Sequence, residues 1–130
     1  MRVVNLGRPA RFLIPAYKVH DSKHSKTGQN IPQAIHDFLM QAFGGYNFSL
    51  GNKVGFFRGQ KSLVECDESK EFCVAFKEDD KKTRVPQLQQ FLASICEDIN
   101  EECIYLECGE DSMFVYPDKP SSRVEVEDNV

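Results

Sequence analysis

Two stretches of the sequence repeat apolar residues at helical spacing on one side only, and they limit the fold more than any other feature. In residues 31–43, and again in residues 86–99, apolar side chains recur every three or four positions, which is the period of one helix face. A helix with a single apolar face needs another surface to cover it. The apolar positions are Ile35, Phe38, Leu39, Ala42 and Phe43 in the first stretch and Leu88, Phe91, Leu92, Ile95 and Ile99 in the second.

The first helix has start and stop signals at both ends. Asn30 followed by Gln33 resembles a capping box, and Pro32 lies in the first turn, where its missing N–H costs nothing. Gly44 predicts a left-handed residue just after the last turn, because glycine adopts this conformation without a Cβ penalty. Gly45 is not needed for the cap. Either it only completes the turn, or it lets the backbone approach a bound ligand closely.

The remaining apolar segments read as strands. We predict strands at 10–19, on either side of a two-residue type II′ turn at Gly59-Gln60 within 53–65, and at 70–78, 102–108 and 112–116. Pro15 indicates that part of the first strand lacks a ladder partner. The expected order is therefore β-α-β-β-β-α-β-β.

This order predicts a fold of the α+β class. We expect a mostly antiparallel sheet with two amphipathic helices on one face, in a ferredoxin-like arrangement. Residues 1–116 are expected to form this single domain, and residues 117–130, which contain two prolines and end in acids, a mobile acidic tail. The other sheet face would be half apolar and would favour a homo-oligomer. It is expected to show Arg11, Tyr17, Cys73, Lys77, Tyr105 and Glu107.

Charge is divided unevenly along the chain. Residues 1–64 hold nine Lys and Arg against two acids, a net charge of +7, whereas residues 65–130 hold seven against eighteen, a net charge of −11. Three arrangements would each explain this division: opposite charges that meet on neighbouring strands, an anion-binding face, or a head-to-tail contact between copies. No apolar run approaches 18 residues and no secretory signal is visible, so we expect a cytoplasmic protein without a membrane span.

The sequence carries none of the common catalytic motifs. It has no nucleophile elbow, no phosphate loop and no zinc-protease helix. Five cysteines without metal-ligand spacing predict reduced, buried thiols. His20 and His24 are expected to be solvated loop residues, and the acid pairs 97–98, 101–102 and 110–111 to be solvated charges. We therefore expect a protein that is not an enzyme, with no cofactor and no metal site.

Binding remains as the function to expect. Nucleic acid is disfavoured, because the net charge is −4 and the signature of an RNA-binding sheet is absent. An anionic small molecule, such as a nucleotide-type signal, needs cations, aromatic faces and close backbone N–H groups. The candidate ligand-binding residues are Arg11, Tyr17, Lys18, Gly45, Tyr46, Asn47 and Arg58.

Several short motifs together resemble those of small uncharacterised bacterial and phage α+β proteins. The first strand reads "FLIPAY", a helix ends in "FGGYN", and "VGFF" precedes the β-rich "LVECDESKEFCVAF". Asn47 stands where threonine is usual in that group, and Phe57 where tryptophan is usual. The resemblance implies a cytosolic α+β protein, and for a phage protein an anti-defence role that sequesters a host signal. The alternative is an inhibitor or adaptor that acts through protein contacts.

Overall fold

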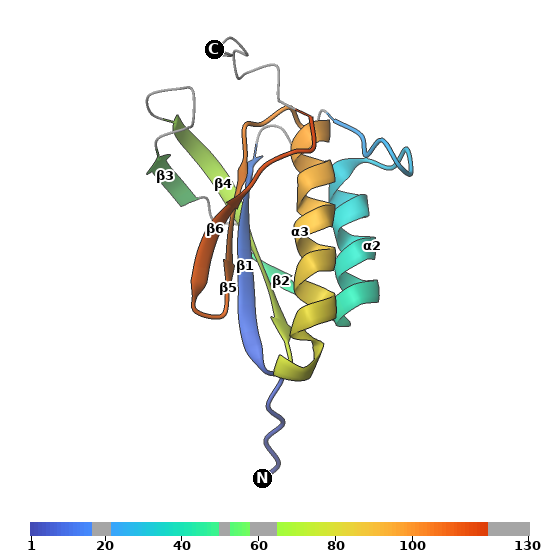
Figure 1. Ribbon diagram of the computed structural model, residues 1–130, viewed down its shortest axis with the longest axis vertical. Coiled ribbons are helices and arrows are strands. Elements are labelled where there is room, and N and C mark those ends of the chain that lie inside the picture. Colours follow the sequence, from blue (N-terminus) through green and yellow to red (C-terminus); the bar gives the residue numbers. More distant parts are fainter. Residues whose placement is uncertain (17–21, 50–52, 58–64, 120–130) are drawn as a thin grey trace.

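The computed structural model describes residues 1–16, 22–49, 53–57 and 65–119, with only the backbone described for 53–57 and 65–68. Two helices cover one face of an antiparallel sheet, as Figure 1 shows. The elements in chain order are β1 (Arg8–Pro15), α2 (Ile31–Phe43), β2 (Asn47–Phe48), β3 (Lys53–Phe57), β4 (Glu65–Phe76), the 3₁₀ turn η1 (Glu78–Asp80), α3 (Lys81–Asp98), β5 (Ile104–Cys108) and β6 (Asp111–Val115). The α+β class and the antiparallel sheet are confirmed.

The sheet is built around β1. Its order is β2-β4-β1-β5-β6, with β3 also paired to β4, and every described pairing is antiparallel. The strand β1 pairs with β4 along its whole length, whereas β5 reaches only Ala10–Phe12. Pro15 therefore has a ladder partner on one side only, as its missing N–H requires.

Helix α2 begins and ends where its sequence signals predict. The side chain of Asn30 accepts a hydrogen bond from the backbone N–H of Gln33 at 2.9 Å, and Gly44 closes the helix at φ 80°. The capping box is only half formed, because the Gln33 side chain donates instead to Asp37 at 2.8 Å.

Helix α3 starts five residues earlier than expected. Residues 79–84, which lie between the predicted strand 70–78 and the predicted helix 86–99, form the end of η1 and the first turn of α3. Three acids in η1 lie at this helix start, where the helix dipole favours negative charge. Pro86 is accommodated inside the helix, at the loss of one backbone hydrogen bond. The helix ends before Asn100, which adopts a left-handed conformation at φ 58°.

The core lies between the helices and one sheet face. Phe12 and Phe72, neighbours on β1 and β4, stack with ring centroids 5.1 Å apart, and Phe38 of α2 stacks on Phe91 of α3 at 4.1 Å. Apart from Phe76, the remaining buried core side chains are aliphatic or small, and those on the strands alternate as the pleat requires. The fully buried ones include Ile14, Ile35, Leu39, Leu88, Leu92, Ile95, Ile104 and Leu106.

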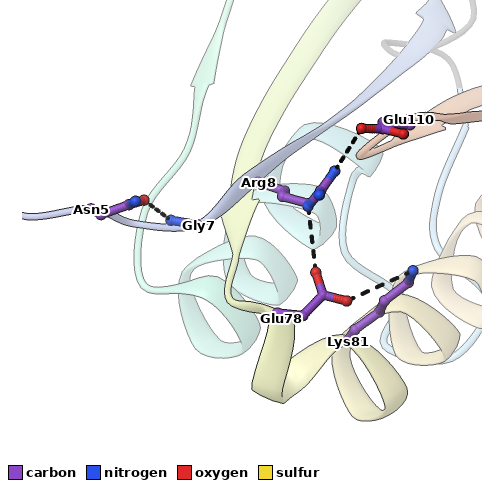
Figure 2. Close-up of polar contacts among 6 residues, drawn as sticks. All are labelled: Asn5, Gly7, Arg8, Glu78, Lys81 and Glu110. Carbon is purple, nitrogen blue, oxygen red and sulfur yellow. Dashed lines mark hydrogen bonds and ion pairs between the residues drawn. The ribbon is translucent and has the colours of Figure 1, made fainter.

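The basic first half and the acidic second half of the sequence meet in the fold. Arg8 forms ion pairs with Glu78 at 3.4 Å and with Glu110 at 3.5 Å (Figure 2). Across the sheet, Arg11 faces Glu107, its Cα partner on β5, at 3.9 Å. Opposite charges on neighbouring elements thus account for part of the charge division.

The middle strands differ from those expected. Instead of separate strands at 61–65 and 70–78, a single long strand runs from Glu65 to Phe76. Phe57, the last residue of β3, pairs with Glu65, the first residue of β4. The expected turn at Gly59-Gln60 lies outside the described residues. A long strand is favoured here because β4 pairs with β1 on one side and with β2 and β3 on the other.

Several charged side chains expected in solvent are buried. His24 and Asp98, separated by 74 positions, form a pair with Nδ1 and Oδ2 2.6 Å apart, and their side chains are only 6% and 5% exposed. Glu101 and Glu102 are also buried. The predictions of solvated charges at these four positions were wrong. The loop 22–30 folds over the end of α3, and this contact excludes water from the pair.

The structure bears on the predicted thiols, metal ligands and membrane spans through its described residues. Cys96, Cys103 and Cys108 are buried and Cys73 is half-buried, all four as free thiols. Among the described residues, no group of three metal-binding side chains comes together. Within the same residues, no helix has the length and apolarity needed to cross a bilayer.

A candidate ligand cleft

A cleft of about 720 Å³ opens where the C-terminal end of α2 passes the C-terminal end of β4. Ligand pockets in proteins are typically about 300–1,000 Å³, so the space is sufficient for a nucleoside-sized molecule. Four separate segments form its walls. They are residues 42–47 at the end of α2 and just after it, residues 73–77 at the end of β4, the residues Leu6, Gly7 and Pro9 around the start of β1, and Asp80 with Arg84 around the start of α3.

The cleft exists because the edge strand is short. β2 has two residues and pairs with β4 only at Phe72 and Cys73. Beyond Cys73, no described strand covers this edge of β4 as far as Phe76, while β1 occupies the opposite edge. Backbone N–H and C=O groups on an uncovered strand edge are available to a ligand.

Two adjacent glycines at the mouth of the cleft differ in their roles. Gly44 has φ 80°, so its conformation requires glycine. Gly45 does not have a positive φ, and a Cβ added to it would have no neighbouring heavy atom within 4 Å. The backbone of Gly45 therefore borders open space, and nothing in the chain itself requires glycine there.

Tyr46 belongs both to the core and to the cleft. Its ring lies 6.2 Å from Phe72 and 6.3 Å from Phe48, and its hydroxyl is 2.9 Å from Nδ1 of His36. The side chain is thus half-buried and held in place. It still contributes to the cleft wall together with Asn47.

Three charged cleft residues were not predicted. Lys77, Asp80 and Arg84 line the cleft from the η1–α3 side. Lys77 was expected on the open sheet face, and no element was predicted for the segment that holds Asp80 and Arg84. The acidic run 78–80 followed by a basic stretch is a typical helix start, and it could have placed these side chains at a helix N-terminus. Arg84 donates to Gln87 at 3.0 Å and forms no ion pair with another described residue.

Of the other predicted ligand-binding residues, the structure describes only Arg11, which does not line this cleft. Arg11 lies on the open sheet face, one strand beyond Cys73, and contacts Glu107 instead. Tyr17, Lys18 and Arg58 lie outside the described residues. Of the seven candidates, the cleft therefore brings together Gly45, Tyr46 and Asn47.

The open sheet face is polar around Arg11. The hydroxyl of Tyr105 donates to Glu107 at 2.6 Å and lies 3.3 Å from Oγ of Ser112. The hydrogen bond to the Glu107 carboxylate raises the pKa of Tyr105, because the carboxylate favours the neutral phenol over the phenolate.

The fold is similar to that of two solved structures. No family model matches the chain, and no curated protein sequence does. Two solved structures match over nearly the whole length. One is a phage SAM (S-adenosylmethionine) lyase in complex with S-methyl-5′-thioadenosine, with 12% identity, a TM-score of 0.56, and coverage of 89% of this chain and 94% of that one. The other is a phage SAM lyase in the apo state, with 13% identity, a TM-score of 0.51, and coverage of 92% and 97%.

This finding overturns two expectations from the sequence. A non-catalytic module that sequesters an anionic signal, or acts as an inhibitor or adaptor, was expected, and so was the absence of enzyme activity. Both structural neighbours are enzymes. The catalytic motifs considered in the sequence were the nucleophile elbow, the phosphate loop and the zinc-protease helix, and none of them identifies a lyase.

Proposed function

We propose that this chain is a lyase that cleaves S-adenosylmethionine and releases methylthioadenosine. The observation that carries the proposal is the match of fold over 89% of the chain to a lyase structure holding S-methyl-5′-thioadenosine. The cleft beside Gly45 supports it, because its volume suits an adenosine compound and its walls carry both apolar and charged groups.

The reaction needs little chemistry from the protein. The sulfonium of S-adenosylmethionine is bonded to a methyl group, to the adenosyl carbon and to an aminocarboxypropyl chain. Breaking the bond to that chain returns both electrons to sulfur and yields neutral methylthioadenosine. In a lyase no water enters, so the four-carbon fragment either closes on its own carboxylate to a lactone or loses a proton to become an alkene. The protein's main contribution is to orient the substrate.

The charged cleft residues suit the amino-acid end of this substrate. Lys77 and Arg84 provide cations for the α-carboxylate, and Asp80 provides an anion for the α-ammonium group. The ring of Tyr46 offers an aromatic face to a sulfonium cation or an adenine. The open space at Gly45 allows backbone groups to approach the ligand.

Other finer assignments belong to the same proposal. We propose a ferredoxin-like arrangement, supported by the position of β1 between β4 and β5 and by helices that each join two parallel strands around an antiparallel one. We also propose a phage protein with an anti-defence role, located in the cytoplasm, where loss of S-adenosylmethionine withdraws the methyl donor from host methyltransferases. Finally, we propose that the protein self-associates into a homo-oligomer.

The test is to incubate the purified protein with S-adenosylmethionine and to follow products by liquid chromatography and mass spectrometry. We expect methylthioadenosine and a lactone or alkene fragment in equal amounts. If the wild-type protein, shown to be folded by circular dichroism, releases no methylthioadenosine above the rate of spontaneous decay, the proposal is wrong.

A pair of variants on one helix turn tests the location of the site. Arg84→Ala removes a cation from the cleft wall, and we expect KM to rise about 10- to 100-fold, the usual effect of losing a charge-assisted hydrogen bond. Lys82→Ala removes an exposed cation that is not part of the wall, and it should leave KM unchanged. Equal KM values for the two variants would place the substrate elsewhere.

A further inference from the structure

Leu6 lines the cleft and yet keeps most of its surface in water. It forms part of the wall together with Gly7 and Pro9, and its side chain is 64% exposed. Burial of an apolar side chain is favourable in proportion to the apolar area that leaves water. A ligand that covers Leu6 would gain this free energy, so the side chain is a binding surface that the fold itself leaves unused.

The turn that carries Leu6 has a fixed shape. The backbone N–H of Gly7 donates to Oδ1 of Asn5 at 2.8 Å (Figure 2), and Gly7 has φ 103°. A Cβ at Gly7 would also overlap the carbonyl oxygen of Phe76. The positive φ and the lack of space both require glycine here. Leu6, between these two residues, is therefore held at a defined place on the cleft wall.

The residue after the turn ties it to the body of the protein. Arg8 forms ion pairs with Glu78 at 3.4 Å and with Glu110 at 3.5 Å (Figure 2). Exposed ion pairs of this kind contribute little to stability. Because they join the start of β1 to η1 and to the β5–β6 turn, they do keep the segment before β1 beside the cleft.

Leu6 is close to one particular end of the cleft. Arg8 is the Cα partner of Phe76 on β4, and Gly7 comes next to Lys77, whose Cα would lie 2.9 Å from a Cβ on Gly7. Leu6 is one residue further along. It therefore neighbours Lys77, one of the cations proposed above for the α-carboxylate of the substrate.

The chemistry of the substrate suggests what Leu6 would cover. In S-adenosylmethionine the sulfur and its methyl group lie between the adenosyl group and the aminocarboxypropyl chain. An apolar side chain next to the place of that chain is in position for the S-methyl group. Contact with leucine suits this group, which is the least polar part of the molecule.

We propose that Leu6 is a specificity residue that covers the S-methyl group of the ligand. It would select methylthio nucleosides over nucleosides that lack this group. This inference rests on the proposed lyase function and extends the substrate site to the segment before β1. Leu6 is exposed, so its replacement should leave the fold intact.

The experiment compares two ligands that differ only in the methylthio group. Dissociation constants for S-methyl-5′-thioadenosine and for 5′-deoxyadenosine are measured by isothermal titration calorimetry. Wild-type protein should bind the methylthio compound about 10-fold more tightly, the usual effect of burying two further apolar groups. Leu6→Ala should weaken binding of the methylthio compound about 5-fold and leave 5′-deoxyadenosine unchanged, so that the preference falls to about 2-fold.

Two further variants serve as controls. Val4→Ala shortens a 58% exposed apolar side chain two positions earlier that does not line the cleft, and it should leave both dissociation constants unchanged. Leu6→Met keeps a long apolar side chain at the wall and should retain most of the preference. Circular dichroism shows that each variant is folded.

The possible results separate this inference from the lyase proposal. If Leu6→Ala weakens both ligands equally, Leu6 contacts the nucleoside and not the S-methyl group, and the inference is wrong. If neither affinity changes, Leu6 lies outside the site, and the inference is wrong even where the same preparation cleaves S-adenosylmethionine. If wild-type protein binds neither ligand, the inference is also wrong, and the assay with S-adenosylmethionine decides the lyase proposal separately.

Discussion

Removal of the Asp98 carboxylate should be among the most destabilising single changes in this protein. Asp98 accepts two hydrogen bonds, from Nδ1 of His24 at 2.6 Å and from the backbone N–H of Ser25 at 3.2 Å. The His24 ring also packs edge-on against Phe91, with centroids 5.8 Å apart. Asp98→Ala would leave a buried imidazole and a backbone N–H without their acceptor.

The expected loss follows from burial. Breaking a buried, hydrogen-bonded charged pair by removing one partner typically costs about 3–5 kcal/mol. Because the loop 22–30 is on the surface and can open to let water reach His24, we expect the lower end, about 3 kcal/mol. Against the total stability of a domain this size, about 5–15 kcal/mol, the variant should still fold at room temperature.

The assay is urea denaturation at neutral pH, followed by circular dichroism. Asp118→Ala serves as the matched control, because this exposed carboxylate accepts a single hydrogen bond from Gln90 at 3.2 Å, and its loss should change stability by less than about 0.5 kcal/mol. A double-mutant cycle with His24→Ala should give a coupling energy of about 1–3 kcal/mol. A loss below about 1 kcal/mol for Asp98→Ala would refute the reasoning, since the desolvation of the two groups would then cancel their attraction.

Two further predictions follow from single residues. Gly44→Ala should destabilise the fold by about 1 kcal/mol, because alanine must adopt a left-handed conformation. Gly45→Ala should leave the urea midpoint unchanged and raise only the KM for S-adenosylmethionine. Equal urea midpoints for the two variants would contradict this prediction. Tyr105→Phe should lose stability relative to wild type at pH 8, and the difference should shrink as the pH rises above about 10. The raised pKa of Tyr105 means that the fold favours the neutral phenol, so its contribution is full below the unfolded pKa and is lost as pH rises through the folded pKa. A constant difference from pH 8 to 11 would argue against the bond to Glu107.

The limits of α2 were predictable because every signal that sets them is local. The Asn30 cap, the apolar stripe and the left-handed Gly44 each act within one or two helix turns. The same holds for the end of α3 before Asn100. The α+β class also followed from the sequence, since two helices with one apolar face each require a sheet to cover them.

The cleft depended on the tertiary structure. Its walls come from four segments, and only the portion at Gly45, Tyr46 and Asn47 was expected from the sequence. No part in a site was predicted for Asp80 and Arg84, because their position beside the end of α2 results from sheet pairing far along the chain. The exposed edge of β4 likewise follows from the two-residue length of β2, which no residue pattern indicated.

The sequence by itself determined where α2 begins and ends and where α3 ends, which residues are apolar, and that a sheet must cover the two helices. Only the tertiary structure decided which charges are buried and which backbone edges stay open. His24 and Asp98 are 74 positions apart, and each taken alone has the pattern of a solvated residue. The physical reason is range: backbone preference and hydrophobic period act over a few residues, whereas desolvation depends on every segment that packs against a group.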